Sequence, residues 1–211
     1  MSLSKNKIKY IQSLKDKKHR LEHKTFVAEG DKMVGELLLS MKCQLLVATK
    51  EYLASAYLKN VEEIIEATPD ELSRASFMKT PQQVLGVFHQ PDNDLNVSIQ
   101  EQLVLALDGV QDPGNMGTIT RLADGYGIQH IFCSMDTADI YNPKTVQATM
   151  GALARVNIHY VDLEKFLNEN KNEMPVYGTL LDGENMYDQQ ITANGIIIMG
   201  NEGNGIRPEI E

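Results

Sequence analysis

The sequence predicts an α/β protein with two domains, a small one over residues 1–92 and a larger one over residues 100–211. Three observations support this prediction. Short apolar runs alternate with segments of helical period along the whole chain. Pro, Asp and Asn cluster between two apolar runs at residues 90–96, which is typical of a linker. Beyond the linker, strands spaced by helices indicate right-handed crossovers and a mainly parallel sheet.

The N-terminal domain is predicted as a small α/β sandwich. Ser4 caps a first helix, Asp31 caps a second that runs to about residue 40, and Pro69 begins a short one, because proline is tolerated in a first turn. A further helix is expected around residues 51–58. The expected strands cover residues 26–28, 44–48, 63–65 and 84–88.

The C-terminal domain is predicted from five strands, which cover residues 103–107, 128–133, 156–161, 176–181 and 196–199. Pro143 begins a helix that runs through about Ala154. Asp162 caps another helix that runs to about Asn170. Both helices lie between strands, as expected for crossover connections.

A polar turn joins the first of these five strands to a helix. Asp112, Pro113 and Gly114 force a tight turn, since proline fixes φ and glycine accepts positive φ. Asn115 is then placed to cap the helix that follows. The spacing i, i+3, i+4, i+7 predicts a buried stripe of Ile119, Leu122, Ala123 and Tyr126.

Arg121 falls on a different face of this helix, near the carboxyl end of a strand. Open α/β sheets bind their ligands at that edge. The alternative interpretation of Arg121 is a surface residue paired with Asp108 or Glu202. Asp108 and Asp112 themselves are interpreted as turn formers rather than catalytic acids.

The net charge of −9 conceals a basic N-terminus. Residues 1–24 hold eight of the 20 Lys and Arg residues against two acidic ones, and the rest of the chain is strongly acidic. A basic arm on an acidic body predicts a local contact with a polyanion, and the alternative is a solvated helix face. His19 and His23 add no convincing metal spacing.

Composition argues against several protein classes. The two cysteines, Cys43 and Cys133, each lie in an apolar run, which indicates buried structural thiols rather than a disulfide framework or a zinc site. No apolar run approaches the roughly 20 residues that span a bilayer, and the N-terminus lacks the apolar core of a secretory signal. We therefore expect a cytoplasmic protein without a metal or a membrane partner.

A glycine-rich loop at residues 200–205 follows the fifth predicted strand directly. Glycines there let backbone N–H groups approach a ligand closely. By itself the loop is a weak signal, because no helix of normal length and no acidic residue about 20 positions later complete a dinucleotide-binding fingerprint. An oxidoreductase is therefore a poor interpretation.

Three segments together are more specific: DPGNMGTITR at residues 112–121, QATMGA at 147–152 and IMGNEGNGI at 198–206. In order and spacing they resemble the SpoU (TrmH-like) RNA 2′-O-ribose methyltransferases of the SPOUT superfamily. More loosely, SKNKI at residues 4–8 and FVAEGDK at 26–32 resemble the RNA substrate-binding domain of that family. The resemblance implies a C-terminal α/β domain with a deep trefoil knot, S-adenosylmethionine as cofactor, and a homodimer.

The resemblance also implies roles for individual residues. The implied catalytic residues are Arg121, Asn115 and Glu202. The implied cofactor-binding residues are Met199, Gly200, Asn201, Gly203 and Thr149. Taken with the basic arm, it suggests that RNA is bound by Lys5, Lys7, Lys9, Lys17, Arg20 and Lys32. Thr149 stands where many members have serine, and its hydroxyl has the alternative role of satisfying a helix carbonyl.

A third family motif is expected roughly 15–30 residues after Gly205, beyond Glu211, so the domain at residues 100–211 is expected to be incomplete at its C-terminus. The resemblance implies that this segment forms much of the knot, half of the cofactor site and much of the dimer interface. We therefore predict activity for the family-length protein.

The implied reaction is methyl transfer to a ribose 2′-hydroxyl in rRNA or tRNA. Such an in-line displacement draws most of its rate from holding the reacting atoms in line. The hydroxyl must lose a proton, yet a guanidinium is almost always protonated and makes a poor base. Our hypothesis is that Arg121 stabilises negative charge on the oxygen and clamps a phosphate, oriented by Asn115 and Glu202. The alternative is a non-catalytic RNA-binding protein on the same fold.

Overall fold

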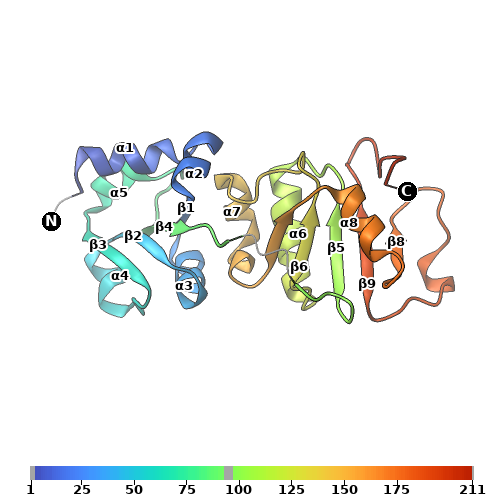
Figure 1. Ribbon diagram of the computed structural model, residues 1–211. Coiled ribbons are helices and arrows are strands. Elements are labelled where there is room, and N and C mark those ends of the chain that lie inside the picture. The colour runs from blue at the N-terminus through green and yellow to red at the C-terminus, as the bar shows by residue number, and fades with distance from the viewer. Residues whose placement is uncertain (1–2, 93–96, 211) are drawn as a thin grey trace. The chain divides into compact units, whose positions relative to one another are not determined.

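The computed structural model describes residues 3–92 and 97–210, in two compact units (Figure 1). The first unit combines residues 3–92 with residues 139–154. The second unit combines residues 97–138 with residues 155–210. Residues 93–96 of the expected linker lie outside the described residues. Residues 139–154, which the sequence groups with the C-terminal half, pack with the first unit.

The first unit is a four-stranded mixed sheet between helices. In chain order its elements are α1 (Lys5–Ser13), α2 (Lys17–His23), β1 (Thr25–Glu29), α3 (Asp31–Ser40), β2 (Cys43–Ala48), α4 (Lys50–Ser55), β3 (Val61–Glu66), α5 (Pro69–Ala75), β4 (Val84–His89), α7 (Pro143–Thr149) and the 3-10 helix η1 (Ala152–Ala154). The strand order is β1-β4-β2-β3, with β4 antiparallel to both neighbours and β2 parallel to β3. Ile11 of α1 and Leu72 of α5 pack with Val27, Val47 and Val87 in one buried cluster.

The four strands of this unit were predicted correctly, as was the Ser4 cap, whose hydroxyl accepts the Lys7 N–H. The Asp31 cap was wrong, because Gly30 precedes the helix with φ 99° and Asp31 is already helical. The predicted helix over residues 143–154 ends at Thr149. Met150 (φ 49°) and Gly151 (φ 96°) take the left-handed conformation there, which a continuous helix does not allow.

The second unit is a five-stranded parallel sheet, as predicted. Its elements are β5 (Leu103–Leu107), α6 (Pro113–Gly125), β6 (His130–Cys133), β7 (Asn157–Tyr160), α8 (Leu163–Asn170), β8 (Val176–Gly178), the 3-10 helix η2 (Met186–Asp188) and β9 (Gly195–Met199). The strand order is β7-β6-β5-β9-β8. The chain proceeds from β5 to one edge, crosses to β8 and returns through β9, so the order reverses between β5 and β9. Ligands of open α/β sheets bind beside such a reversal, at the carboxyl ends of the strands.

The two faces of this sheet are covered by α6 and α8, which Figure 1 shows on opposite sides. Leu163 and Leu167 of α8 pack with Val104 and Ile196. On α6 the predicted buried stripe was largely wrong. The buried residues of α6 are Met116, Gly117, Thr120 and Ala123, whereas Leu122 is 54% exposed and Tyr126 is 81% exposed.

The reason for this error is that apolar periodicity overlooks small residues and polar residues that bond within their own helix. Thr120 is buried at little cost because its hydroxyl donates to the Met116 carbonyl at 2.8 Å.

Cys43 and Cys133 are buried free thiols, as predicted, and burial raises the pKa of both. Among the described residues, no helix is long and apolar enough to cross a membrane.

Candidate functional site

Two loops leave the second sheet side by side at its carboxyl edge. Leu107, the last residue of β5, is paired in register with Met199, the last residue of β9. The Asp108 N–H extends this ladder by donating to the Met199 carbonyl at 2.9 Å. The polar turn at residues 108–112 and the glycine loop at 200–206 therefore begin next to each other. The two loops are neighbours in space although they are more than 90 residues apart in the sequence.

The first loop ends at the N-terminus of α6, where the cap differs from the prediction. Asp112 is the N-cap, and its carboxylate accepts the Asn115 N–H at 2.8 Å. Pro113 follows as the first helical residue, a position that suits its missing N–H. Asn115 is therefore already inside the helix. Its side-chain amide donates to another loop and is not the cap.

The Asn115 side chain instead joins the two loops. Its Nδ2 donates to Oε1 of Glu202 at 2.9 Å. This hydrogen bond is the main cause that holds the pKa of Glu202 below its ordinary value, so Glu202 is a carboxylate at neutral pH. The structure thus brings together two of the three residues predicted to be catalytic.

The glycine loop is folded back on itself. The backbones of Asn201 and Gly205 exchange two N–H···O hydrogen bonds, both 2.9 Å long. The Asn201 side-chain oxygen accepts the N–H groups of Gly203 and Asn204, at 2.9 and 3.0 Å. The Asn201 Nδ2 reaches across to the Gly109 carbonyl at 2.7 Å. Asn201 therefore both shapes the loop and attaches it to the neighbouring one.

Gly200 is required by the crossing of this loop. A Cβ at Gly200 would lie 2.2 Å from the Gly205 carbonyl carbon and 2.3 Å from the Ile206 nitrogen. No side chain fits at that distance. Four residues predicted to bind the cofactor thus lie together, at the end of β9 and in the hydrogen-bonded loop that follows it: Met199, Gly200, Asn201 and Gly203.

The sequence analysis missed an ion pair beside this turn. The side chain of Asp108 is fully buried and is held by Arg207, which donates to it from its backbone N–H at 2.8 Å and from Nε at 2.7 Å. Arg207 also approaches Asp136 at 3.8 Å. The interpretation of Asp108 as a turn former was therefore incomplete. The available signal was an acidic residue directly after a buried strand and an arginine directly after the glycine loop.

The remaining predicted site residues are placed as follows. Arg121 is exposed on α6, six residues beyond Asn115, or about 9 Å further along the helix axis. Thr149 is buried at the end of α7, in the first unit, and its hydroxyl donates to the Val146 carbonyl at 2.7 Å. This bond is the alternative role anticipated for that hydroxyl.

The predicted RNA-binding residues all belong to the first unit. Lys5, Lys9, Lys17 and Lys32 are exposed, and Lys7 forms an ion pair with Glu63.

Arg20 differs from these lysines because it is buried. Its guanidinium donates to the Leu14 and Lys15 carbonyls and to Asp139 at 2.8 Å. The side chain of Arg20 therefore holds the first unit together instead of adding to its exposed basic surface.

The first unit also contains a potential ligand group. His19, Glu22 and His23 of α2 present ligand atoms within 4.8 Å of one another. Lys17 and Lys18 on the same short helix add positive charge that opposes a bound cation. None of these three side chains belongs to the two loops at residues 108–112 and 200–206.

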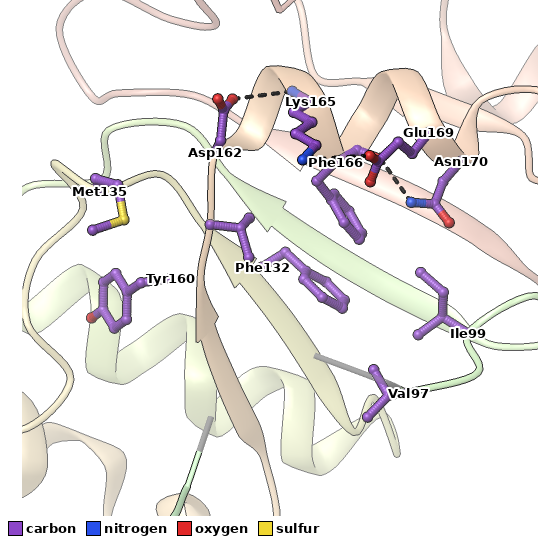
Figure 2. A pocket seen from close by; sticks show the side chains of 11 residues that line it. Val97, Ile99, Phe132, Met135, Tyr160, Asp162, Lys165, Phe166, Glu169 and Asn170 are labelled. Atoms are coloured by element: carbon purple, nitrogen blue, oxygen red, sulfur yellow. Dashed lines mark hydrogen bonds and ion pairs between the residues drawn. The ribbon is translucent and has the colours of Figure 1, made fainter. Parts of the chain in front are cut away.

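A cavity of about 440 Å³ lies beneath α8 in the second unit (Figure 2). Figure 2 shows aromatic and aliphatic side chains on its floor and polar ones of α8 at its rim. The rings of Phe132 and Phe166 stack there with centroids 4.0 Å apart. None of the predicted catalytic or cofactor-binding residues lines this cavity. The convergence of polar groups therefore points to the two loops as the candidate site.

Comparison with protein families gives two matches that together cover most of the chain. Residues 102–211 match the model of the SpoU rRNA Methylase family, and residues 5–86 match that of an MRM3-like substrate binding domain. A Bacillus subtilis relative named 23S rRNA (guanosine(2553)-2′-O)-methyltransferase RlmP is 32% identical over 209 residues, 97% of this chain and 83% of the relative. A Xenopus laevis relative, mitochondrial rRNA methyltransferase 3, is 28% identical over 71% of this chain but 38% of its own length.

Solved structures resemble the chain over nearly its whole length. A putative RNA methyltransferase of the TrmH family from Porphyromonas gingivalis has a TM-score of 0.90 and 39% identity, covering 99% of this chain and 84% of that one. An AdoMet-bound rRNA methyltransferase from Sinorhizobium meliloti has a TM-score of 0.85 and 31% identity, covering 100% and 84%.

Proposed function

Because this chain belongs to the SpoU rRNA methylase family, we propose that it transfers a methyl group from S-adenosylmethionine to a ribose 2′-hydroxyl of rRNA. It is an RNA 2′-O-ribose methyltransferase. The observation that carries the proposal is the Asn115–Glu202 hydrogen bond, which joins two family motifs at the switch point of the sheet. The substrate is placed in rRNA because the relatives that match both halves of the chain are named as rRNA enzymes.

The residues around the glycine loop fit S-adenosylmethionine. The loop provides half-buried backbone at Met199 and Gly200. Beside it, the chain leaving β8 begins at Thr179, whose N–H donates to the Ile198 carbonyl, and continues into Leu180 and Leu181, both exposed. Exposed leucines next to a polar loop suit a ligand with a flat aromatic base and a charged tail. When bound, this cofactor supplies an electrophilic methyl group.

The chain's own residues are proposed to act on the RNA oxygen. Glu202, ionised and held by Asn115, orients groups at the mouth of the two loops. Arg121 projects from the exposed side of the same helix that carries Asn115. Its guanidinium stabilises negative charge that develops on the 2′-oxygen and binds the adjacent phosphate. Thr149, whose hydroxyl donates to the Val146 carbonyl, is proposed as a cofactor-binding residue on the family resemblance alone.

Single-turnover methyl transfer tests the role of Arg121. Rates are measured against pH for the wild type and for Arg121→Lys in the full-length protein. Lysine keeps the charge but not the two-pronged contact, so we expect a fall of at least tenfold across the whole pH range. Near-equal rates at every pH would remove Arg121 from the chemistry.

RNA is proposed to bind the first unit through its exposed lysines. Lys5, Lys9, Lys17 and Lys32 add positive charge without an ion pair among the described residues, while Lys7 shares its charge with Glu63. Replacing the four exposed lysines with alanine should weaken RNA binding and flatten its dependence on salt, because fewer counterions are released. Lys42→Ala, which removes a lysine paired with Glu62, is the matched control. An unchanged salt slope in the fourfold variant would overturn this assignment.

We also propose a cytoplasmic homodimer. Leu122 and Tyr126, both largely exposed on α6, provide apolar surface next to Arg121 for a second copy. Buried free thiols at Cys43 and Cys133 suit a reducing compartment. Light scattering of wild type and of a Leu122→Glu, Tyr126→Glu variant tests the dimer, which should become monomeric. A wild-type monomer at micromolar concentration would contradict it.

Calorimetry and RNA mapping test the activity as a whole. The protein should give heat with S-adenosylmethionine, and ribose methylation mapped across total RNA should disappear at one rRNA position in a deletion strain. No heat with the cofactor together with retained RNA affinity would instead indicate a non-catalytic RNA-binding protein.

A further inference from the structure

The exit of the glycine loop is tied to the central strand by one ion pair. Arg207 follows the loop directly, and Asp108 follows β5 directly. The Arg207 backbone N–H donates to one carboxylate oxygen of Asp108, and Nε and a terminal nitrogen bind the other oxygen at 2.7 and 2.5 Å. The main chain and the side chain of Arg207 therefore both bind the same carboxylate.

The contacts with Arg207 compensate for the burial of the Asp108 carboxylate. Its side chain has no exposed surface, and a buried carboxylate without a partner is strongly unfavourable. The guanidinium of Arg207 is 42% exposed, so it does not itself fill the core. Asp108 is thus the buried member of the pair, directly after β5, and Arg207 is the partly exposed member, directly after the loop.

The Asp108–Arg207 ion pair lies next to the point where the glycine loop crosses itself. The loop crosses itself at Gly200, where the backbone from Gly205 to Ile206 passes within van der Waals distance. Arg207 comes one residue after this crossing. Other contacts hold the body of the loop, from Asn201 to Gly109 and from Glu202 to Asn115 and to the backbone of Gln111 and Asp112. At the exit, Arg207 is hydrogen-bonded to Asp108, and its guanidinium also approaches Asp136 at the longer distance of 3.8 Å.

We propose that Arg207 is a positioning residue for methyl transfer, which fixes the exit of the Gly200–Ile206 loop on Asp108 and thereby sets the affinity of that loop for S-adenosylmethionine. This inference rests on the proposed function. A loop held at its exit presents its backbone groups in one arrangement, and ordering them in advance removes that cost from binding. Release of the exit leaves Asn115 and Glu202 in contact but lets the crossing at Gly200 open.

The test compares Arg207→Ala and Arg207→Lys with wild type in the full-length protein. Arg155→Ala is the matched control, because it removes an Arg–Asp pair (to Asp124) of the same unit, at the far end of α6. Amide hydrogen exchange of residues 201–206 is measured without cofactor. Cofactor affinity is measured by calorimetry, and steady-state kinetics give KM for S-adenosylmethionine and for RNA separately.

The expected result is selective. Arg207→Ala should speed exchange in the loop at least tenfold and raise both Kd and KM for S-adenosylmethionine at least tenfold, with KM for RNA within twofold of wild type. Arg207→Lys should recover part of the affinity, because it keeps the side-chain charge that alanine removes but loses the bidentate guanidinium. Arg155→Ala should match wild type in every measurement.

A double variant, Asp108→Asn with Arg207→Ala, separates positioning from general instability. It removes the buried charge that Arg207→Ala leaves unpaired, so its thermal denaturation should return toward wild type while its cofactor affinity stays weak.

Three results would overturn the inference: unchanged loop exchange in Arg207→Ala, an equal rise in KM for RNA, or full affinity in the double variant. A wild-type protein without affinity for S-adenosylmethionine would contradict the proposed function instead, and the exchange data would still report whether Arg207 holds the loop.

Discussion

Replacement of Gly200 by alanine tests the crossing of the glycine loop most directly. An ideal Cβ at this position would lie 2.2 Å from the Gly205 carbonyl carbon, 2.5 Å from its oxygen and 2.3 Å from the Ile206 nitrogen. Ordinary contacts begin near 3.4 Å. The atoms that clash are backbone, so no rotamer change relieves them. One strand of the loop must therefore move by roughly 1 Å.

The size of the effect follows from what this movement breaks. The Asn201–Gly205 hydrogen bonds, each 2.9 Å, stretch beyond bonding distance. Each contributes about 1 kcal/mol, so the free energy of unfolding should fall by roughly 1–3 kcal/mol. The effect on catalysis should be larger. A displacement of about 1 Å in a positioned group costs roughly 100-fold in rate.

The assay pairs methyl-transfer kinetics with denaturant unfolding, both in the full-length protein. Gly203→Ala is the control, since a Cβ there would meet only the Asn201 side-chain oxygen, at an ordinary 3.6 Å. We expect its unfolding free energy to stay within about 0.5 kcal/mol of wild type. Gly200→Ala with a wild-type value of kcat/KM, or a Gly203→Ala that is equally destabilised, would refute the reasoning from the crossing.

Three further predictions concern single contacts. Asn115→Ala removes the hydrogen bond that lowers the pKa of Glu202, so a carbon-13 NMR titration should show that pKa rise toward its ordinary value; an unmoved titration would mean that Asn115 does not hold the carboxylate. Burial lowers the pKa of His130, whose Nδ1 lies 3.0 Å from Nε2 of His159, so stability is present above the unfolded pKa of about 6.5 and is lost as pH falls through the folded value. His130→Gln, which stays neutral, should flatten the loss of unfolding free energy between pH 7 and pH 5, and a curve parallel to wild type would contradict this assignment. Gly35→Ala should stabilise the protein by about 1 kcal/mol in the same denaturation assay, because Gly35 is inside α3 with open space where a Cβ would stand, and a destabilised variant would show that the site is not open.

The strands and the helix starts were largely determined by local sequence. β5 was predicted at its observed bounds because a continuous apolar run ended in a turn signal. Ser4 and Asp162 were predicted as caps and accept backbone N–H groups. Asn115 was displaced from the cap by Asp112, because Pro113 suits the first helical position and sets the start of the helix three residues earlier than a cap at Asn115 would.

The family, and through it the reaction and cofactor, could also be identified from sequence, because three motifs kept their order and spacing over about 100 residues. The motifs named Asn115 and Glu202 as partners in one site, and their side chains lie 2.9 Å apart.

Only the tertiary structure decided which surfaces meet. Periodicity along α6 gave the wrong buried face, since Gly117 and Thr120 are buried against the sheet without being apolar. The Asp108–Arg207 pair joins residues 99 positions apart, and the local sequence marks each as a candidate without showing that the two meet. Their meeting depends on β9 returning beside β5, a choice of strand order made by long-range packing. Local chemistry thus determined the elements and the motifs, whereas the order of the strands determined which loops could form a site.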